Sequence, residues 1–224
     1  MITSRDNERL KLVRKLHDRR WRDKLGLFVV EGEDLVAAAG EAGIEPVHLL
    51  AADENVAPAL LAEVSALAHP PRVVAIYRRD DLPRGTRPVT LALWRVADPG
   101  NVGTLLRSAD AFDAGVALSP GCADPTSPKA LRASMGAVFR VPLAGFDEAP
   151  GRRIALVPSG GVPLPELALD GEVALVLGAE REGLPEAVLA RCDERATIPQ
   201  PGRAESLNVA MAGTVALYEL ARRP

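Results

Sequence analysis

Four short hydrophobic runs in the second part of the chain show no alternation of apolar and polar residues. They are Val89–Leu93, Val116–Leu118, Ile154–Val157 and Val173–Leu177. Runs of this kind are typical of strands that are buried on both faces, as in a parallel sheet covered by helices. Helical stretches fall between or after them, near residues 102–113, 127–134, 185–191 and 206–222. This order predicts an α/β domain built on a mainly parallel sheet.

The first part of the chain predicts a smaller α/β domain. Residues 6–24 are expected to form one helix, with Leu10, Val13 and Leu16 on its apolar side. The elements expected after it are a strand, a helix, a strand, a helix and a strand, at Leu27–Val30, 31–40, Val47–Leu50, 56–68 and Val73–Tyr77. Asp80 to Pro88 is rich in turn formers and charge, which is typical of a linker. We therefore expect domains at residues 1–85 and 86–224.

The composition, with 47% hydrophobic and 25% charged residues in a chain of 224, is that of a globular protein. No apolar run approaches the roughly 18 residues that span a bilayer. Met1 to Leu10 are polar and charged, so we expect no signal peptide. Cys122 and Cys192 stand at no metal-ligand spacing. We expect a cytoplasmic protein that has no metal site and no membrane partner.

The charges are unevenly distributed along the chain. Residues 1–24 contain nine Lys or Arg residues and four acidic ones, a net charge of +5. The whole chain carries −3, which leaves −8 on the other 200 residues. A basic segment on an acidic body has two interpretations, a solvated amphipathic helix or a local contact with a polyanion.

Three polar, glycine-containing loops follow apolar runs, and ligands of open α/β sheets bind at such strand ends. The first loop, Asp98–Arg107, opens a helix. Asn101 would be its N-cap, and Gly103 would let it approach the sheet closely. Arg107 lies off the apolar side, within reach of an anion near the helix start. The alternative is an ordinary capped helix with a surface arginine.

The second loop, Gly178–Pro185, directly follows the run that ends at Leu177. Gly178 at a strand end would allow a ligand close to the backbone. Glu180 would accept hydrogen bonds from a ligand or hold another loop. A plain turn, with Pro185 at the first helical position, is the alternative.

The third loop, Ile198–Ala210, leads into the last helix. Ser206 is a natural N-cap, and Asn208 would sit on the first turn, pointing towards the same loop region. Ser206 acting only as a cap is the alternative. The helix continues with an apolar stripe formed by Leu207, Met211, Val215 and Tyr218.

Several common kinds of site lack their sequence motif. The chain has no G-x-x-x-x-G-K-[ST], which argues against a P-loop NTPase, and no G-x-G-x-x-G after a strand, the fingerprint of dinucleotide binding. Its three histidines, His17, His48 and His69, all fall in the first domain without metal or triad spacing. Zinc chemistry and serine–histidine hydrolysis therefore lack their main candidates.

Taken together, the three loops resemble the three motifs of the SpoU (TrmH-type) branch of the SPOUT RNA methyltransferases. Two segments between the first and second loops, Ser119–Pro125 and Lys129–Pro142, also match the family pattern. Thr3–Asn7 and Phe28–Gly32 resemble the ribosomal-protein-like substrate-binding domain that often precedes the catalytic domain. The resemblance covers nearly the whole chain, and three motifs in order at these spacings are a specific signal.

The resemblance implies a SPOUT fold with a deep C-terminal trefoil knot, and S-adenosylmethionine bound in the knot. It also implies a homodimer whose active site draws on both subunits. By position, five residues match those that hold the cofactor: Leu177, Gly178, Ala179, Ile198 and Leu207. Five others match the catalytic and RNA-facing site: Asn101, Arg107, Glu180, Ser206 and Asn208. The departures from the family pattern are Gln200-Pro201, Ala210 and Asp113.

The implied reaction is methyl transfer to a ribose 2′-hydroxyl, a group that RNA has and DNA lacks. Ribosomal RNA is favoured over transfer RNA because the extra domain is typical of ribosomal RNA modifiers. We expect RNA contacts from Arg5, Arg9, Lys11, Lys15 and Arg132. A non-catalytic RNA-binding or ribosome-assembly factor of the same fold is the alternative, and a methyltransferase of small molecules is disfavoured by the first domain.

Overall fold

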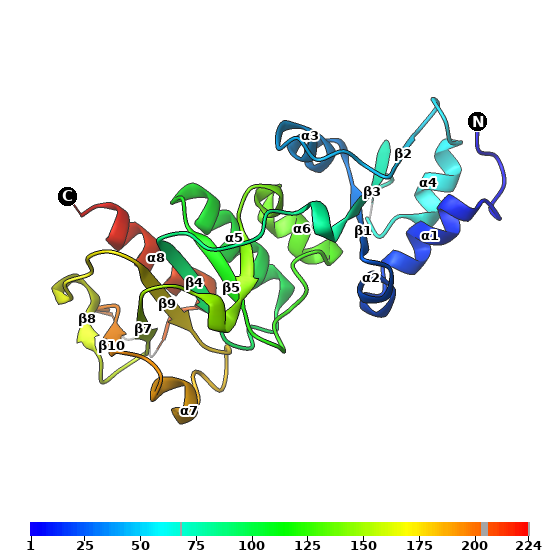
Figure 1. Cartoon of the computed structure of the whole chain (residues 1–224). Helices are drawn as coiled ribbons and strands as arrows, with labels where there is room; N and C mark the ends of the chain where they lie inside the picture. The colour runs from blue at the N-terminus through cyan, green and yellow to red at the C-terminus, as the bar shows by residue number, and fades with distance from the viewer. Residues whose placement is uncertain (68, 203–205, 224) are drawn as a thin grey trace.

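The computed structural model describes residues 1–67, 69–202 and 206–223, which form two units lying side by side (Figure 1). Residues 203–205 of the third loop, residue 68 at the expected end of a helix, and residue 224 lie outside this description. The first unit contains α1 (Glu8–Leu16), α2 (Arg19–Leu25), β1 (Leu27–Glu31), α3 (Glu33–Glu41), β2 (His48–Ala51), α4 (Pro58–Val64), β3 (Val73–Arg78) and the short 3-10 helix η1 (Arg79–Asp81).

The first unit is built on a three-stranded antiparallel sheet with the order β1-β3-β2. Side chains alternate between its faces because successive residues of a strand point in opposite directions. In β1, Val29 packs with α1 and α4, whereas Phe28 and Val30 face α3 and the second unit. Both faces are thus covered, which explains why these strands read as continuous apolar runs.

The single helix expected over residues 6–24 is wrong, because the chain breaks at His17 and Asp18 into α1 and α2. Asp18 adopts an extended conformation and its side chain accepts a hydrogen bond from Arg20 N, which starts a new helix. The apolar side of α1 is as expected, with Leu10, Val13 and Leu16 all buried.

The second unit confirms the expected parallel sheet. Its seven strands have the order β6-β5-β4-β9-β7-β10-β8, and every pair is parallel. The elements are β4 (Val89–Leu93), α5 (Pro99–Ala111), β5 (Gly115–Leu118), α6 (Pro128–Ser134), η2 (Ala137–Phe139), β6 (Leu143–Gly145), η3 (Phe146–Glu148), β7 (Arg152–Leu156), β8 (Val162–Pro163), η4 (Leu164–Glu166), β9 (Val173–Leu177), α7 (Glu186–Leu189), β10 (Glu194–Thr197) and α8 (Val209–Ala221).

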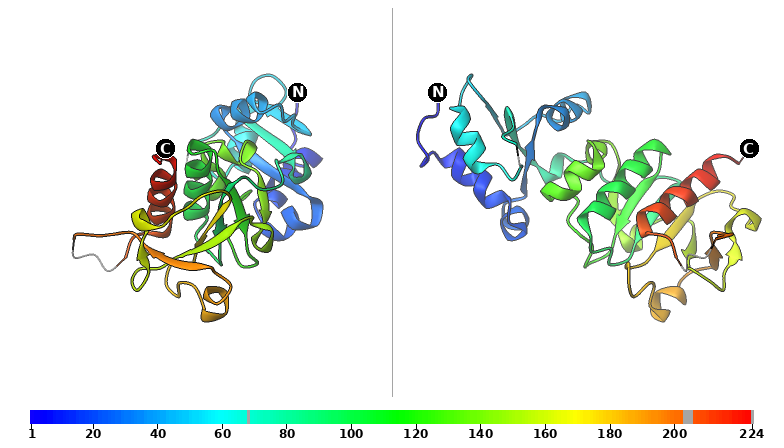
Figure 2. Two further views of the ribbon diagram at one scale, coloured as in Figure 1. Left: turned by 60° about the vertical axis from the view of Figure 1, so that its left-hand side comes forward. Right: turned by 180° about the vertical axis from the view of Figure 1, so that it is seen from behind.

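The two faces of this sheet bury side chains of different size. Leu91 and Leu93 of β4 pack under α5 and α8, whereas Ala92 faces the smaller cluster around Phe146 and α7. The views from two further sides show α8 lying beside α5 (Figure 2). Gly103 of α5 brings that helix close to α6 rather than to the sheet, since a methyl group there would lie 2.6 Å from Ala133 Cβ.

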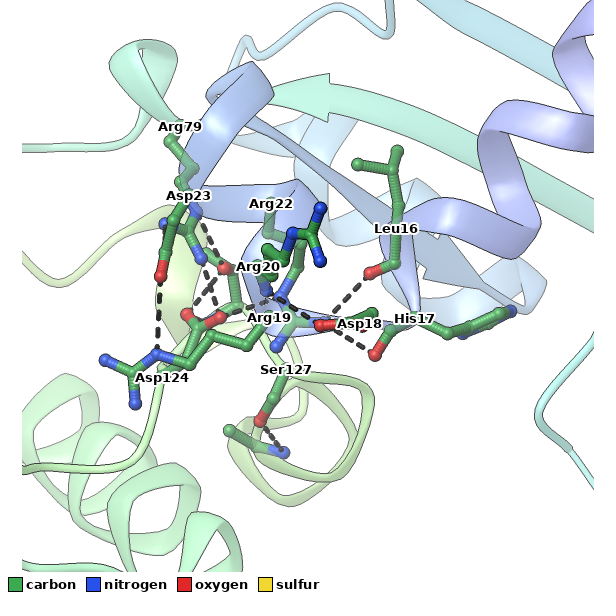
Figure 3. A network of polar contacts seen from close by, with 12 residues as sticks. Leu16, His17, Asp18, Arg19, Arg20, Arg22, Asp23, Arg79, Asp124 and Ser127 are labelled. Atoms are coloured by element: carbon green, nitrogen blue, oxygen red, sulfur yellow. Dashed lines mark hydrogen bonds and ion pairs between the residues drawn. The ribbon is translucent and has the colours of Figure 1, made fainter.

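The two units share an interior. Phe28 of the first unit stacks on Phe139 of the second with ring centroids 6.3 Å apart, and the ring of Tyr77 is tilted against Phe139 at 5.6 Å. Beside this cluster, Asp124 of the second unit accepts hydrogen bonds from Arg22 Nε at 2.7 Å and Arg79 Nη2 at 2.6 Å (Figure 3). The two units are therefore packed against each other through apolar and ionic contacts.

The segment expected as a linker, residues 80–88, joins the two units but lies packed along β6. Leu82 is buried, Leu143 N donates to Pro83 O at 3.0 Å, and Gly85 N donates to Leu143 O at 3.1 Å. No helix of the described residues is both long and apolar enough to cross a membrane.

Candidate active site

The three loops picked out in the sequence meet at the carboxyl edge of the parallel sheet. β4 and β9 are neighbours with Leu93 opposite Leu177, so the first and second loops leave the sheet side by side. The second and third loops, with residues 156–158 at the end of β7, line a cavity of about 440 Å³, and the first loop lies beside it. This size is in the range of pockets that hold small organic ligands.

A hydrogen-bonded chain of three side chains ties the three loops together. Asn208 Nδ2 donates to Asn101 Oδ1 at 3.1 Å, and Asn101 Nδ2 donates to Glu180 Oε1 at 2.9 Å. A carboxylate only accepts hydrogen bonds, so Glu180 fixes the orientation of the Asn101 amide, and Asn101 in turn fixes that of Asn208. The Asn208 carboxamide also accepts hydrogen bonds from Ala210 N and Met211 N.

Three helix starts lie one to three residues from where the sequence predicts them. The N-cap of α5 is Asp98, not Asn101, and Pro99 occupies the first turn. The N-cap of α8 is Asn208, not Ser206, which is exposed. Pro185 is the N-cap of α7 rather than its first helical residue. The shift leaves the Asn101 side chain free to bind Glu180.

Glu180 is held in its ionised form. Its partial burial raises the pKa, but hydrogen bonds from Asn101 and from the backbone N–H groups of Asp98 and Ala97 lower it, so the pKa lies below the usual value. Asp98 is likewise kept ionised, because its hydrogen bond with Lys129 Nζ, 2.7 Å long, lowers its pKa. The carboxylate of Glu180 at the cavity, and that of Asp98 beside it in the first loop, are thus both stabilised by nearby donors.

The five residues expected to hold a cofactor all line this cavity: Leu177, Gly178, Ala179, Ile198 and Leu207. Gly178 is required by its own loop. A methyl group on it would overlap the backbone of Gly183 and lie 2.6 Å from Leu184 N.

Gln200, a departure from the family pattern that the resemblance places beside the adenosine pocket, lines the cavity. Its Oε1 is buried and has no hydrogen-bond partner among the residues that the structure describes. A buried acceptor without a donor is costly, so such an atom marks a place where a ligand with an N–H or O–H group would bind favourably.

The two remaining residues expected in the catalytic site, Ser206 and Arg107, differ in their position relative to the cavity. Ser206 lines the cavity beside Asn208. Arg107, on α5, is exposed, does not line the cavity, and its side chain makes no hydrogen bond or ion pair with a described residue. A chain taken alone therefore brings together Asn101, Glu180 and Asn208, but not Arg107.

The residues expected to contact RNA all lie at the surface. Some of them pair with a carboxylate, and the others do not. Arg5 pairs with Glu63 at 2.9 Å, and Lys11 pairs with Glu8 at 3.0 Å. Arg9, Lys15 and Arg132 are exposed and form no ion pair within the described part of the chain. Among those residues, no group of three or more His, Cys, Asp or Glu side chains is placed to bind a metal ion.

The fold and the cavity define an α/β protein with a small-molecule site at the carboxyl edge of a parallel sheet. The chain belongs to the SpoU rRNA methylase family, whose model matches residues 88–218. Residues 7–78 match the MRM3-like substrate-binding domain. Membership implies the knotted C-terminal topology and a methyltransferase of the class that uses S-adenosylmethionine.

Relatives in several bacteria resemble the chain over nearly its full length. The 23S rRNA (guanosine(2553)-2′-O)-methyltransferase RlmP of Bacillus subtilis is 31% identical, and the match covers 98% of each chain. The 23S rRNA (uridine(2479)-2′-O)-methyltransferase of Streptomyces viridochromogenes is 33% identical, over 99% of this chain and 92% of that one. The crystal structure of an rRNA methyltransferase from Sinorhizobium meliloti with AdoMet (S-adenosylmethionine) bound is 31% identical, with a TM-score of 0.85 over 99% and 96% of the two chains.

Proposed function

We propose that this protein transfers a methyl group from S-adenosylmethionine to a ribose 2′-hydroxyl of ribosomal RNA. The observation that carries the proposal is the Asn208–Asn101–Glu180 chain of hydrogen bonds at the rim of the 440 Å³ cavity. The family assignment and the named activities of the two relatives support the same reaction. Those two relatives act on different nucleotides, a guanosine and a uridine.

The lining of the cavity fits S-adenosylmethionine. Leu177, Ile198 and Leu207 offer apolar contacts to an adenine ring, and the unpaired Gln200 Oε1 would accept a hydrogen bond from an amino or hydroxyl group. The carbonyls of Leu177 and Ala179 already accept one hydrogen bond each, from Trp94 N and Gly183 N. Each keeps a second lone pair for a ligand. When bound, S-adenosylmethionine supplies a methyl group activated by its positive sulfur.

The residues of the site would orient and activate the ribose. Ser206 and Asn208, at the cavity wall, position the sugar, while Glu180 holds the first and second loops together. Arg107 binds the adjacent phosphate and stabilises negative charge that develops on the 2′-oxygen. A guanidinium cannot act as the base in a protein, so the phosphate or a water molecule takes the proton. Arg107→Lys and Arg107→Ala should then lose activity equally with RNA binding intact.

Arg107 would reach the site from a second copy of the chain. The apolar stripe expected on the last helix is exposed on α8, with Met211 and Tyr218 each 58% accessible. A face of this kind is costly in water and fits a twofold contact with the same face of another copy. Leu207 belongs to both this face and the cavity lining, so a dimer through α8 would also close one side of the cavity.

We propose that residues 1–85 bind the RNA substrate, while residues 86–224 carry the reaction, and that the protein works in the cytoplasm. The match of residues 7–78 to a substrate-binding domain supports this division. The buried contacts between the units would hold the bound RNA at a fixed position relative to the cavity.

The test is methyl transfer from labelled S-adenosylmethionine to two substrates, deproteinised ribosomal RNA and bulk transfer RNA. Both should come from cells that lack this protein, so that the target is unmodified. Label in the ribosomal pool alone is the expected result. Label in the transfer RNA pool alone would show that transfer RNA, not ribosomal RNA, is the substrate. Failure of the protein to bind the cofactor would favour a non-catalytic RNA-binding factor.

A further inference from the structure

The positive charges of the first 24 residues fall into two groups. Five of the nine lie within 4.0 Å of a carboxylate, as shown by Arg5–Glu63, Lys11–Glu8, Arg14–Glu63, Arg19–Asp23 and Arg22–Asp124. Four have no ion pair with a residue that the structure describes, namely Arg9, Lys15, Arg20 and Lys24. The unbalanced charge of this basic segment therefore resides in four side chains.

Three of these four surround one aromatic ring. Lys15 Nζ, Arg20 Cζ and Lys24 Nζ lie 5.1, 5.5 and 5.2 Å from the centroid of Trp21. The three cations are exposed, and Trp21 is half-buried. Like charges gathered around one ring repel each other, so a bound anion would relieve this arrangement.

Trp21 has no evident role in the interior. It belongs to none of the hydrophobic clusters of the described residues, whereas Trp94 packs against Phe146 with ring centroids 5.1 Å apart. Cation–π contacts at exposed sites contribute only about 0.5–1 kcal/mol. The cations can therefore leave the ring for a phosphate at little cost.

We infer that Trp21, Lys15, Arg20 and Lys24 form a binding surface for an unpaired nucleotide of the RNA, with its base stacked on Trp21 and its phosphates on the three cations. Proteins bind single-stranded RNA with this combination of an aromatic ring and nearby positive charge. A duplex offers no free base face along its length, so the surface selects an unpaired segment. The inference rests on the proposed function, which makes RNA the substrate.

The surface is rigidly connected to the methyltransferase unit. Arg22, next to Trp21 in α2, forms the buried ion pair with Asp124 of the second unit (Figure 3). α1 and α2 lie at the end of the molecule away from α8 (Figures 1 and 2). A nucleotide held by Trp21 would thus lie at a set position relative to the cavity, remote from the nucleotide that is methylated within the same chain.

The experiment measures binding of the full chain to a short oligouridylate, which is unstacked and unpaired, by fluorescence anisotropy of the labelled RNA. Trp21→Leu keeps apolar bulk and removes the ring, and it should weaken binding by about 5- to 150-fold. Lys24→Gln should lower the slope of log K against log salt by about 0.7, the value for one contact to a single strand. Arg195→Gln removes the same charge from a residue that is paired with Glu186 in the second unit, and it should leave affinity and slope close to those of the wild type.

Binding of Trp21→Leu with wild-type affinity would overturn the inference, as would equal binding of a duplex and of oligouridylate to the wild type. Loss of binding to anionic vesicles in Trp21→Leu, without a change for RNA, would overturn it in favour of a membrane contact.

Methyl transfer is measured in parallel. If the wild-type protein transfers no methyl group while Trp21→Leu no longer binds oligouridylate, the proposed function is refuted but the inferred binding surface is retained. Active Trp21→Leu with unchanged KM for RNA would refute the surface alone.

Discussion

Asn208 donates its side-chain N–H to Asn101 Oδ1 across 107 positions of the chain, at 3.1 Å. The same Asn208 carboxamide caps α8, and the same Asn101 carboxamide donates to Glu180. Each amide thus has one orientation that satisfies both of its contacts. The start of α8, the first turn of α5 and the loop after β9 are therefore held in one arrangement around the cavity.

Asn101→Ala breaks this arrangement at its centre. A hydrogen bond to a charged group contributes about 1.5–3 kcal/mol, so kcat/KM should fall roughly 10- to 100-fold. Asn101→Asp should fall further, because it places a second negative charge beside Glu180. The measurement is steady-state methyl transfer, with thermal unfolding as control. A variant that retains full activity would show that the Asn101 contact does not position the site.

The ionised form of Glu180 gives the site a defined pH response. The folded pKa is below the ordinary 4.5, because hydrogen bonds outweigh the effect of burial. Its stabilising contribution is thus fully present above about pH 4.5 and is lost as the pH falls through the lower folded value. Calorimetric titration with S-adenosylhomocysteine should show constant affinity from about pH 5 to 8. Affinity that falls between pH 7 and 5 in the wild type but not in Glu180→Gln would contradict this.

Gly178→Ala should weaken cofactor binding by displacing the second loop. The added methyl would overlap the backbone of Gly183, so we expect a cost of about 1–3 kcal/mol in stability or loop geometry. Gly183→Ala is the matched comparison, since φ is +64° there and the space around it is open. Gly183→Ala should lose only the free energy needed to hold a residue with a side chain in the left-handed conformation, about 1–2 kcal/mol. The two variants are compared by cofactor affinity, and a smaller loss for Gly178→Ala would contradict the account.

Asp124→Ala should be strongly destabilising. The carboxylate is 6% exposed and binds both Arg22 and Arg79, so its removal leaves buried positive charge, at a cost of about 3–5 kcal/mol. Asp23→Asn is the matched control, because Asp23 also pairs with Arg79 at 2.6 Å but is 52% exposed. Its cost should be about 0–1 kcal/mol. Urea unfolding midpoints measure both, and equal costs would show that burial of Asp124 is not decisive.

Val215→Asp should dissociate the dimer that we propose. Val215 lies on the exposed stripe of α8 and is 41% accessible. In a twofold contact the new carboxylate of one copy is buried against the same carboxylate of the other copy. The two buried charges repel each other, so the dimer should not form. Leu49→Asp, also 41% accessible but on β2, should leave the oligomeric state unchanged. Sedimentation reports both, and a wild type that sediments as a monomer at working concentration would remove the dimer from the account.

The central parallel sheet was predictable because β4, β5, β7 and β9 are buried on both faces and read as apolar runs. β10 was missed, since Glu194–Thr197 contains a single buried residue and lies near the edge of the sheet. The break between α1 and α2 carries a signal, Asp18 as an N-cap, which the apolar periodicity concealed.

The composition of the site was predictable in part. The cofactor residues expected from the motif positions share one cavity, but the helix starts were misplaced. Asp98 followed by Pro99 is a stronger start signal than Asn101. The reason that Gly178 must be glycine lies in the backbone of Gly183, which no sequence pattern reveals. Arg107 does not line the cavity of one chain, and the role that we propose for it depends on a second copy of the chain.

The most direct measurement locates the transferred methyl group. Ribosomal RNA from cells that lack this protein is incubated with labelled S-adenosylmethionine and either wild-type protein or Asn208→Ala, then hydrolysed in alkali. We expect label in one alkali-resistant dinucleotide with the wild type, and a large loss of that label with Asn208→Ala. Label recovered in a methylated base, or in ordinary mononucleotides, would contradict ribose 2′-O-methylation.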